Sequence, residues 1–100
     1  VPQPPVAGVK RLVIPGGREI PLQGVAMEIG AEADNHIVLP YAGVMAYHAS
    51  IKQADNGNWW VESRDVTKSI VVNGAEGMSF WLTHGSRITL GSAEIIYLER

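Results

Sequence analysis

The residue types that most often carry chemistry in proteins are few in this chain and far apart. Its three histidines, His36, His48 and His84, form no His-x-His or His-x-x-x-His pair, and the chain contains no cysteine. A zinc site would have to draw its ligands from distant segments. Serine, histidine and aspartate are all present, but no Gly-x-Ser-x-Gly motif marks a nucleophile. We therefore expect no metal, no cofactor and no catalytic activity.

Charge and composition disfavour several further classes of protein. The formal net charge is −2, and the 8 lysines and arginines are scattered along the chain. Nucleic acid is not expected as a partner, because its binding proteins concentrate basic residues on one face. No apolar run approaches the roughly 18 residues of a membrane span, and the first residues lack the basic and apolar regions of a signal peptide. We expect a cytoplasmic protein without membrane insertion.

The first eight residues, VPQPPVAG, differ in composition from residues 9–100. Their three prolines favour an extended linker. With 46% hydrophobic and 18% charged residues, the 100-residue chain can form one core and has no room for a second domain. We predict a Pro-rich linker over residues 1–8, one domain over residues 9–100, and a place within a longer protein.

Short β-prone runs alternate with turn signals along the rest of the chain, which is typical of a sandwich or barrel. The pairs Asn56-Gly57 and Asn73-Gly74 suit tight hairpins because both residue types tolerate positive φ. No window combines helical apolar spacing with capping residues over ten or more positions. We predict an all-β fold, an antiparallel β-sandwich of about 10–11 short strands. The runs lie at 9–14, 19–22, 25–29, 36–39, 47–53, 59–63, 69–72, 79–82, 87–90 and 94–98.

The segment from Ile29 to Ile51, IGAEADNHIVLPYAGVMAYHASI, resembles the first half of a forkhead-associated (FHA) domain. The family pattern there is an apolar residue, Gly-Arg, a short loop with asparagine, an apolar strand, and then Ser-x-x-His before another strand. Gly30 stands at the family glycine, Asn35 at the loop asparagine and His48 at the family histidine. The spacing is matched without a gap.

The second half of the chain continues the resemblance, which covers about residues 10 to 98. Asp65-Val66 resembles the family's Asp-Leu, and Asn73-Gly74 stands in its Val-Asn-Gly motif. The resemblance implies an FHA/SMAD-like β-sandwich of eleven strands, whose loops at one end bind phosphothreonine in partner proteins. It also implies structural roles for Gly30, His48, Asn73 and Gly74, with His48 hydrogen-bonding neighbouring loops. The closing family pattern is matched by Leu82, Gly85, Ile88, Leu90 and Gly91.

The sequence departs from the family at the positions that contact the phosphate. The family's arginine after the glycine is Ala31 here, and its serine before the histidine is Met45. The loop with Ser-x-Asn-Gly-Thr is shortened to 66–69, Val-Thr-Lys-Ser. A phosphate dianion needs charge-assisted donors, which a methyl group and a thioether do not supply. Losing two hydrogen bonds to a charged group removes roughly 3–6 kcal/mol of binding free energy.

We therefore expect a protein-interaction module of a larger signalling or regulatory protein. It would bind a protein or peptide partner without recognising phosphothreonine in the usual way. One alternative is phosphothreonine binding through substitute donors, supplied by Lys68, Thr67, Ser69, Ser50 or Arg64. Another is a structural domain that assembles a homo-oligomer through a sheet face or edge. The candidate binding residues are Ala31, Glu32, Asn35, Tyr41, Met45, Tyr47, Thr67, Lys68 and Ser69.

Apolar residues crowd the loop where the family binds its ligand. Tyr41, Val44, Met45 and Tyr47 all lie within it. Such residues at a loop tip are costly to leave in water. They either form a contact patch or turn inward to close the end of the sandwich.

The three tryptophans lie on predicted strands. Because neighbouring residues on a strand face opposite sides, one of Trp59 and Trp60 should be in the core and the other partly exposed. An exposed tryptophan would suit an interface. We expect Trp81 to pack in the core.

Overall fold

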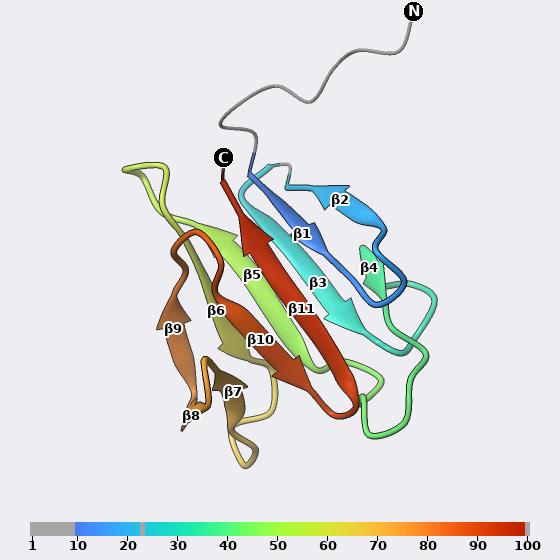
Figure 1. The fold of residues 1–100 in the computed structure, drawn as a ribbon. Coiled ribbons are helices and arrows are strands. Elements are labelled where there is room, and N and C mark those ends of the chain that lie inside the picture. Colours follow the sequence, from blue (N-terminus) through green and yellow to red (C-terminus); the bar gives the residue numbers. More distant parts are fainter. Residues whose placement is uncertain (1–9, 23, 100) are drawn as a thin grey trace, which may run out of the picture.

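The computed structural model describes residues 10–22 and 24–99, and these residues form two β-sheets that face each other (Figure 1). The six-stranded sheet has the order β2-β1-β11-β10-β7-β8, and the five-stranded sheet has the order β4-β3-β5-β6-β9. The described residues contain no helix, so the predicted all-β sandwich is confirmed. The linker predicted over residues 1–8 lies outside the described residues. The strands are β1 (Arg11–Val13), β2 (Glu19–Pro21), β3 (Ala26–Gly30), β4 (Ile37–Val38), β5 (Ala49–Gln53), β6 (Trp59–Ser63), β7 (Ile70–Val72), β8 (Ala75–Gly77), β9 (Ser79–Trp81), β10 (Arg87–Leu90) and β11 (Ala93–Leu98).

All ten predicted runs contain a strand, and β8 is the strand that the sequence did not indicate. Its residues, Ala-Glu-Gly, have low β-propensity. The strand forms because Asn73 (φ 53°) and Gly74 (φ 82°) make a two-residue turn with positive φ at both positions. This turn places Ala75 directly opposite Val72, so β8 pairs with β7. Turn geometry, and not side-chain preference, creates this strand.

The core lies between the two sheets, where alternate residues of each strand point inward. Along β11, for example, Ala93, Ile95 and Tyr97 are buried while the residues between them are more exposed. Each fully buried large aliphatic side chain stabilises the fold by roughly 1.5–3 kcal/mol. The largest fully buried side chains are Tyr97, Leu12, Ile29, Ile37, Leu39, Ile51, Ile70, Ile88, Leu90, Ile95 and Val61.

Strand pairing is antiparallel throughout the described residues except between β3 and β4, which are parallel. Ile29 lies opposite Ile37 and Gly30 opposite Val38, so the connection over 31–36 must fold back beside β3. A hydrogen bond from the backbone N–H of Glu28 to Nδ1 of His36, 2.9 Å long, fixes the end of this connection. The predicted antiparallel sandwich thus contains one parallel pair.

The tryptophans divide between the core and the outer face of the five-stranded sheet. Trp59 is buried and Trp60 is partly exposed, as expected from strand alternation. The prediction for Trp81 is wrong, because its side chain is 61% exposed. Trp81 lies on the edge strand β9, directly opposite Trp60 on β6, and both side chains face outward. Phe80, one residue earlier, faces inward and packs against the core in its place.

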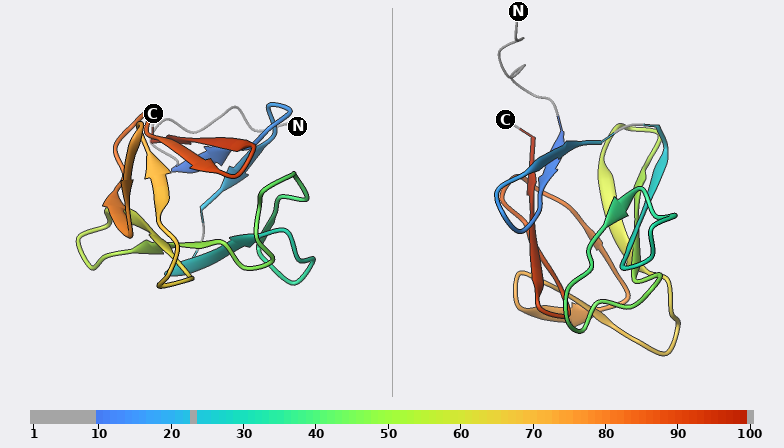
Figure 2. Two further views of the ribbon diagram at one scale, coloured as in Figure 1. Left: turned by 90° about the horizontal axis from the view of Figure 1, so that it is seen from below. Right: turned by 90° about the vertical axis from the view of Figure 1, so that its right-hand side faces the viewer.

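Four connections gather at one end of the sandwich. They are residues 31–36, 39–48, 64–69 and 91–92, and we call them together the loop end. In Figure 1 they lie at the lower right and bottom, while the β5–β6 hairpin lies at the opposite end. The views in Figure 2 show the two sheets as separate layers, and of these four connections it is 64–69 that runs from one sheet to the other.

Candidate functional site

Short backbone contacts join the connections of the loop end to one another. The N–H of Ala31 donates to the carbonyl oxygen of Met45 at 2.9 Å, and the N–H of Glu32 donates to that of Ala46 at 3.2 Å. The N–H of Ser92 donates to the carbonyl oxygen of Ala42 at 2.9 Å, which ties the β10–β11 turn to the long β4–β5 connection. The loop end is therefore one connected surface.

Gly30 and Asn35 fill the space beneath this surface. A Cβ atom added at Gly30 would overlap the carbonyl oxygen of Ala46 and lie 2.8 Å from Nδ2 of Asn35. The buried Asn35 amide donates from Nδ2 to the carbonyl oxygens of Ala46 at 2.8 Å and Glu32 at 2.9 Å. Gly30 does not have a positive φ. Glycine is required here because the backbone of Ala46 approaches too closely for a side chain.

His48 is buried where three strands begin or end. Its backbone N–H donates to Ile29 and its carbonyl oxygen accepts from Arg64. Its Nδ1 accepts a hydrogen bond from the backbone N–H of Met45 at 3.2 Å, so this nitrogen carries no proton. Burial lowers the pKa of His48 below its ordinary value, which also favours the neutral ring. His48 therefore holds the β4–β5 connection in place through Met45. It does not face solvent, as a metal ligand or a catalytic base would.

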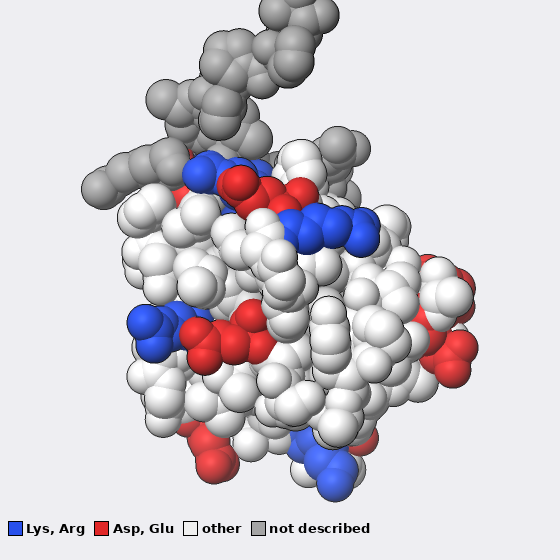
Figure 3. Space-filling view, turned by 45° about the vertical axis from the view of Figure 1, so that its right-hand side comes forward, with Lys and Arg blue, Asp and Glu red and all other residues white. Residues whose placement is uncertain are grey.

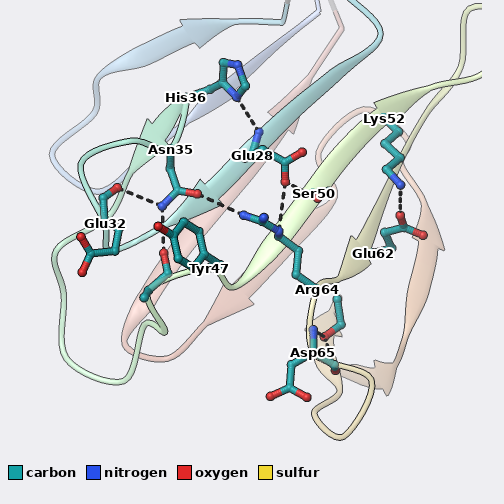
Figure 4. A network of polar contacts seen from close by, with 12 residues as sticks. Glu28, Glu32, Asn35, His36, Tyr47, Ser50, Lys52, Glu62, Arg64 and Asp65 are labelled. Carbon is teal, nitrogen blue, oxygen red and sulfur yellow. Dashed lines mark hydrogen bonds and ion pairs between the residues drawn. The ribbon is translucent and has the colours of Figure 1, made fainter.

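Arg64 is the cation at the centre of the site, and its guanidinium is engaged by other side chains (Figure 4). Its Nε lies 3.1 Å from a carboxylate oxygen of Glu28, and its Nη1 donates to Oδ1 of Asn35 at 3.3 Å. The hydroxyl of Ser50 donates to the same Glu28 carboxylate at 2.5 Å. The Arg64 guanidinium also lies over the ring of Tyr47, 4.9 Å from its centroid.

Asp34 extends this network to the surface. The hydroxyl of Tyr47 donates to Oδ2 of Asp34 at 3.0 Å, and this hydrogen bond raises the pKa of Tyr47. Glu28 was not among the site residues expected from the sequence. Glu28 lies opposite Ser50 on the outward face of β3, so strand alternation with the correct register could have identified it.

The β6–β7 connection is closed on itself by hydrogen bonds. Oδ1 of Asp65 accepts from the backbone N–H of Thr67 at 2.9 Å and from its hydroxyl at 2.6 Å. These bonds lower the pKa of Asp65, so it carries a negative charge at neutral pH. The hydroxyl of Ser69 contacts Glu76 at 3.4 Å, and Lys68 is exposed. The Thr67 hydroxyl is thus occupied within the connection.

The remaining candidate residues form the rim of the loop end. Ala31 and Met45 are partly buried beside each other, and Glu32 is exposed. Tyr41 and Tyr47 are 40% and 44% exposed. Val44 packs against the core, so the apolar residues of this connection divide between an exposed pair of tyrosines and an inward-facing valine.

The face drawn in Figure 3 has no basic patch. Its acidic and basic side chains form small separate groups, with much uncharged surface between them. In the described part of the chain, no group of three or more histidine, aspartate or glutamate side chains is placed to hold a metal ion. Nor does any described helix have the length and apolarity to cross a membrane.

Solved FHA domains are similar to this chain in fold. Mycobacterium tuberculosis EmbR, solved in complex with a low affinity phosphopeptide, is 28% identical with a TM-score of 0.81. That match covers 92% of this chain but only 24% of EmbR. The FhaA FHA domain, solved in complex with the intracellular domain of Rv3910, is 28% identical with a TM-score of 0.79 over 88% of this chain and 98% of that one.

A third structure comes from an analysis of phosphothreonine-dependent FHA domain interactions. It is 26% identical with a TM-score of 0.83, and the match covers 92% of this chain and 97% of the other. No curated protein matches the chain. The FHA domain pattern itself matches residues 27–91, which contain Gly30, His48 and the Asn73-Gly74 turn. This match extends over more than half of the sequence, and the chain therefore belongs to the FHA domain family.

Proposed function

We propose that this FHA domain binds a protein or peptide partner with its loop end and does not require a phosphothreonine. The observation that carries the proposal is the pair Ala31 and Met45. These residues stand where the family has an arginine and a serine, and neither side chain can donate to a phosphate. Their backbone N–H groups bond within the chain, to Met45 and His48 respectively.

The substitute donors considered from the sequence are mostly occupied. Arg64 bonds to Glu28 and Asn35, and the hydroxyls of Ser50 and Thr67 donate to carboxylates. A phosphate would have to displace these partners, and the hydrogen bonds lost within the chain would offset those made to the phosphate. Exposed Lys68 remains, but one ammonium group beside the ionised Asp65 attracts an anion weakly.

Exposed acidic residues also disfavour a phosphate at this surface. Glu32 and Asp34 lie in the 31–36 connection, directly after the position of the family's arginine. Residues 19–51 contain four acidic residues and no lysine or arginine. A dianion brought to this connection would meet like charges, which cost free energy at short range.

The tyrosines of the rim suit contact with a protein. Tyr41 and Tyr47 combine a large apolar ring with a hydroxyl, and tyrosine is among the residues most common at binding hot spots. The Tyr47 ring is held between Asp34 and Arg64, so it loses little freedom on binding. An interaction role agrees with an absence of catalysis and with a cytoplasmic location, both of which stay predictions.

Calorimetric titration with a degenerate phosphothreonine peptide library and its unphosphorylated twin tests the phosphate part of the proposal. We expect no preference for the phosphorylated peptides at low or high salt. A phosphate-dependent affinity that weakens with salt would overturn the proposal. It would identify Lys68, Arg64 or the neighbouring hydroxyls as substitute donors.

Selection of unphosphorylated binders from a displayed peptide library tests the location of the surface. Binding of the selected peptides should fall at least about tenfold in Tyr47→Ala, the loss expected for a central aromatic contact. Trp81→Ala is the matched control. It also removes an exposed aromatic ring, but this ring lies on the edge strand β9 and not in the loop end. Equal loss in both variants, or loss in Trp81→Ala alone, would place binding elsewhere.

A further inference from the structure

A shallow aromatic groove lies on the five-stranded sheet, formed by strands β6 and β9. It has a volume of about 210 Å³ and is lined by Trp60, Ser79, Phe80 and Trp81. The rings of Trp60 and Trp81 meet edge to face with their centroids 5.5 Å apart. Because Trp81 is 61% exposed, the groove presents a large uncovered indole to solvent. The function proposed for the loop end does not use this surface.

The chemistry of the groove favours an uncharged ligand. By strand register, two charged side chains share this outer face beside the groove, Lys52 opposite Trp60 and Glu62 opposite Ser79. These two form an ion pair with each other. The groove therefore offers rings and a hydroxyl but no unpaired charge. Aromatic grooves of this kind bind polyproline II segments, whose proline rings pack against indoles and lose little entropy on binding.

This chain contains a segment of that type. Residues 1–8 read VPQPPVAG, with Pro2 and Pro5 in the P-x-x-P spacing and no charged side chain. With three residues per turn, Pro2 and Pro5 fall on the same side of a polyproline II helix. Two prolines can therefore face one surface together.

The described end of the chain lies within reach of the groove. Nζ of Lys10 donates to the carbonyl oxygen of Gly57 at 2.6 Å, in the β5–β6 hairpin that leads into Trp60. The path from Gly57 along β6 to Trp60 and across to Trp81 is roughly 15 Å, at about 3.3 Å per residue and 5 Å between strands. Measured from the Lys10 backbone, this path is longer by the extended lysine side chain and its hydrogen bond to Gly57. At about 3.1 Å per residue, Pro2 can reach roughly 25 Å from Lys10 and so spans the whole path, while Pro5 reaches roughly 15 Å towards its Trp60 end.

We propose that the proline segment Pro2–Pro5 docks in the Trp60–Trp81 groove of its own chain. Docking would cover the exposed indole, which lies on the same outer sheet face as Glu28 but outside the loop end. The occupant is favoured by its uncharged composition, by the proline spacing and by the position of Lys10.

A spin label tests this docking in the full chain. The chain has no cysteine, so Gln3→Cys gives a single site for a nitroxide. In the ¹⁵N-labelled protein we expect the indole N–H signals of Trp60 and Trp81 to lose intensity, and the signal to return when the nitroxide is reduced. The amide of Val38, on β4 at the opposite edge of the same sheet, should keep its intensity. Equal intensity loss at Val38 and the two indoles would overturn the proposal.

Two variants separate docking in the groove from mere proximity. Trp81→Ala in the labelled chain should restore the Trp60 signal, and Pro2→Ser with Pro5→Ser should restore both indole signals. Tyr47→Ala, which removes an exposed aromatic ring at the loop end, should leave the intensity loss unchanged. Persistent loss at Trp60 in Trp81→Ala would show that the groove does not hold the segment.

A mixed sample distinguishes docking within one chain from docking between copies. Spin-labelled chain without ¹⁵N is mixed with ¹⁵N-labelled chain without the spin label. We expect no intensity loss at Trp60 or Trp81 in this mixture. A loss that rises with concentration would overturn docking within the chain and show that the segment binds a second copy.

Discussion

Gly30, Asn35 and His48 lie beneath the loop end, and we call them the framework. The framework and the rim above it obey different constraints, although their residues are neighbours in sequence. Gly30 and His48 bond or pack directly against backbone, and His48 is only 7% exposed. Ala31 and Met45 lie beside them, joined by one backbone hydrogen bond, and their side chains make no polar contact that the fold needs. The proposed function rests on this contrast, since it takes the framework as matching the family and the rim as departing from it.

If the proposed function holds, the two regions differ because a binding surface can change while its fold persists. Overlap with backbone or an unpaired buried N–H destabilises every folded molecule, whatever it binds. Rim side chains are exposed or only partly buried, so they contribute less to stability. Substitutions in the framework should therefore change mainly stability, and substitutions in the rim should change mainly binding.

Gly30→Ala, a substitution in the framework, should have the largest effect on stability. The new methyl group would overlap the carbonyl oxygen of Ala46 and crowd Asn35, so the 39–48 connection must move. We expect a loss of about 3 kcal/mol in the free energy of unfolding, the upper range for overpacking at a rigid site. Urea denaturation measures it.

Gly77→Ala is the matched control for this substitution. Its added methyl group would also lie 2.8 Å from another atom, but that atom is at the far end of the Phe80 ring and not in the backbone. We expect a smaller loss than for Gly30→Ala. If the two variants lose equal stability, close backbone approach is not the reason for glycine at position 30.

His48→Ala should have the next largest effect. It leaves the N–H of Met45 without its acceptor and removes a buried ring. We expect a loss of about 1–3 kcal/mol, the cost of an unsatisfied buried donor. An unchanged denaturation midpoint would show that His48 does not hold the β4–β5 connection.

The pH dependence of stability tests the protonation state of the same residue. Burial lowers the pKa of His48 in the folded protein, so the unfolded chain binds this proton more tightly. Stability from this group is complete above the ordinary histidine pKa of about 6.5 and falls as the pH drops below it. His48→Asn keeps an acceptor for Met45 but cannot titrate, so its stability should fall less between about pH 7.5 and pH 5.5. Parallel curves for the two proteins would contradict a neutral, buried His48.

Much of the fold could be predicted from the sequence because turns and strands leave local signals. The runs between Gly, Pro and Asn-Gly turns located ten strands, and the spacing from Gly30 to His48 located the framework. The assignment of edge strands could not be predicted in this way. Trp81 has a large apolar side chain of the kind that is common in cores. It is exposed because it faces outward on β9, at the edge of the sheet.

The candidate site was less predictable because its contacts cross between distant segments. Arg64 was considered as a donor, but its pairing with Glu28 and Asn35 depends on the register of β3, β5 and β6. Asn35 was selected as a binding residue, and the structure places it in the buried framework. Loop sequence alone does not tell whether a polar side chain bonds outward or inward.

Ala31→Arg combined with Met45→Ser should have the smallest effect on stability and the clearest effect on binding. Both side chains are only partly buried, so the free energy of unfolding should change by about 1 kcal/mol at most. The Ala31–Met45 backbone bond holds the two positions side by side, so the variant places a guanidinium and a hydroxyl next to each other. Calorimetry should then detect a preference for phosphothreonine peptides that the unmodified chain lacks, and high salt should weaken it. The single variants serve as controls, since an arginine alone supplies charge without the hydroxyl. Equal phosphate preference before and after substitution would contradict the distinction between framework and rim, because the rim would then not determine what the loop end binds.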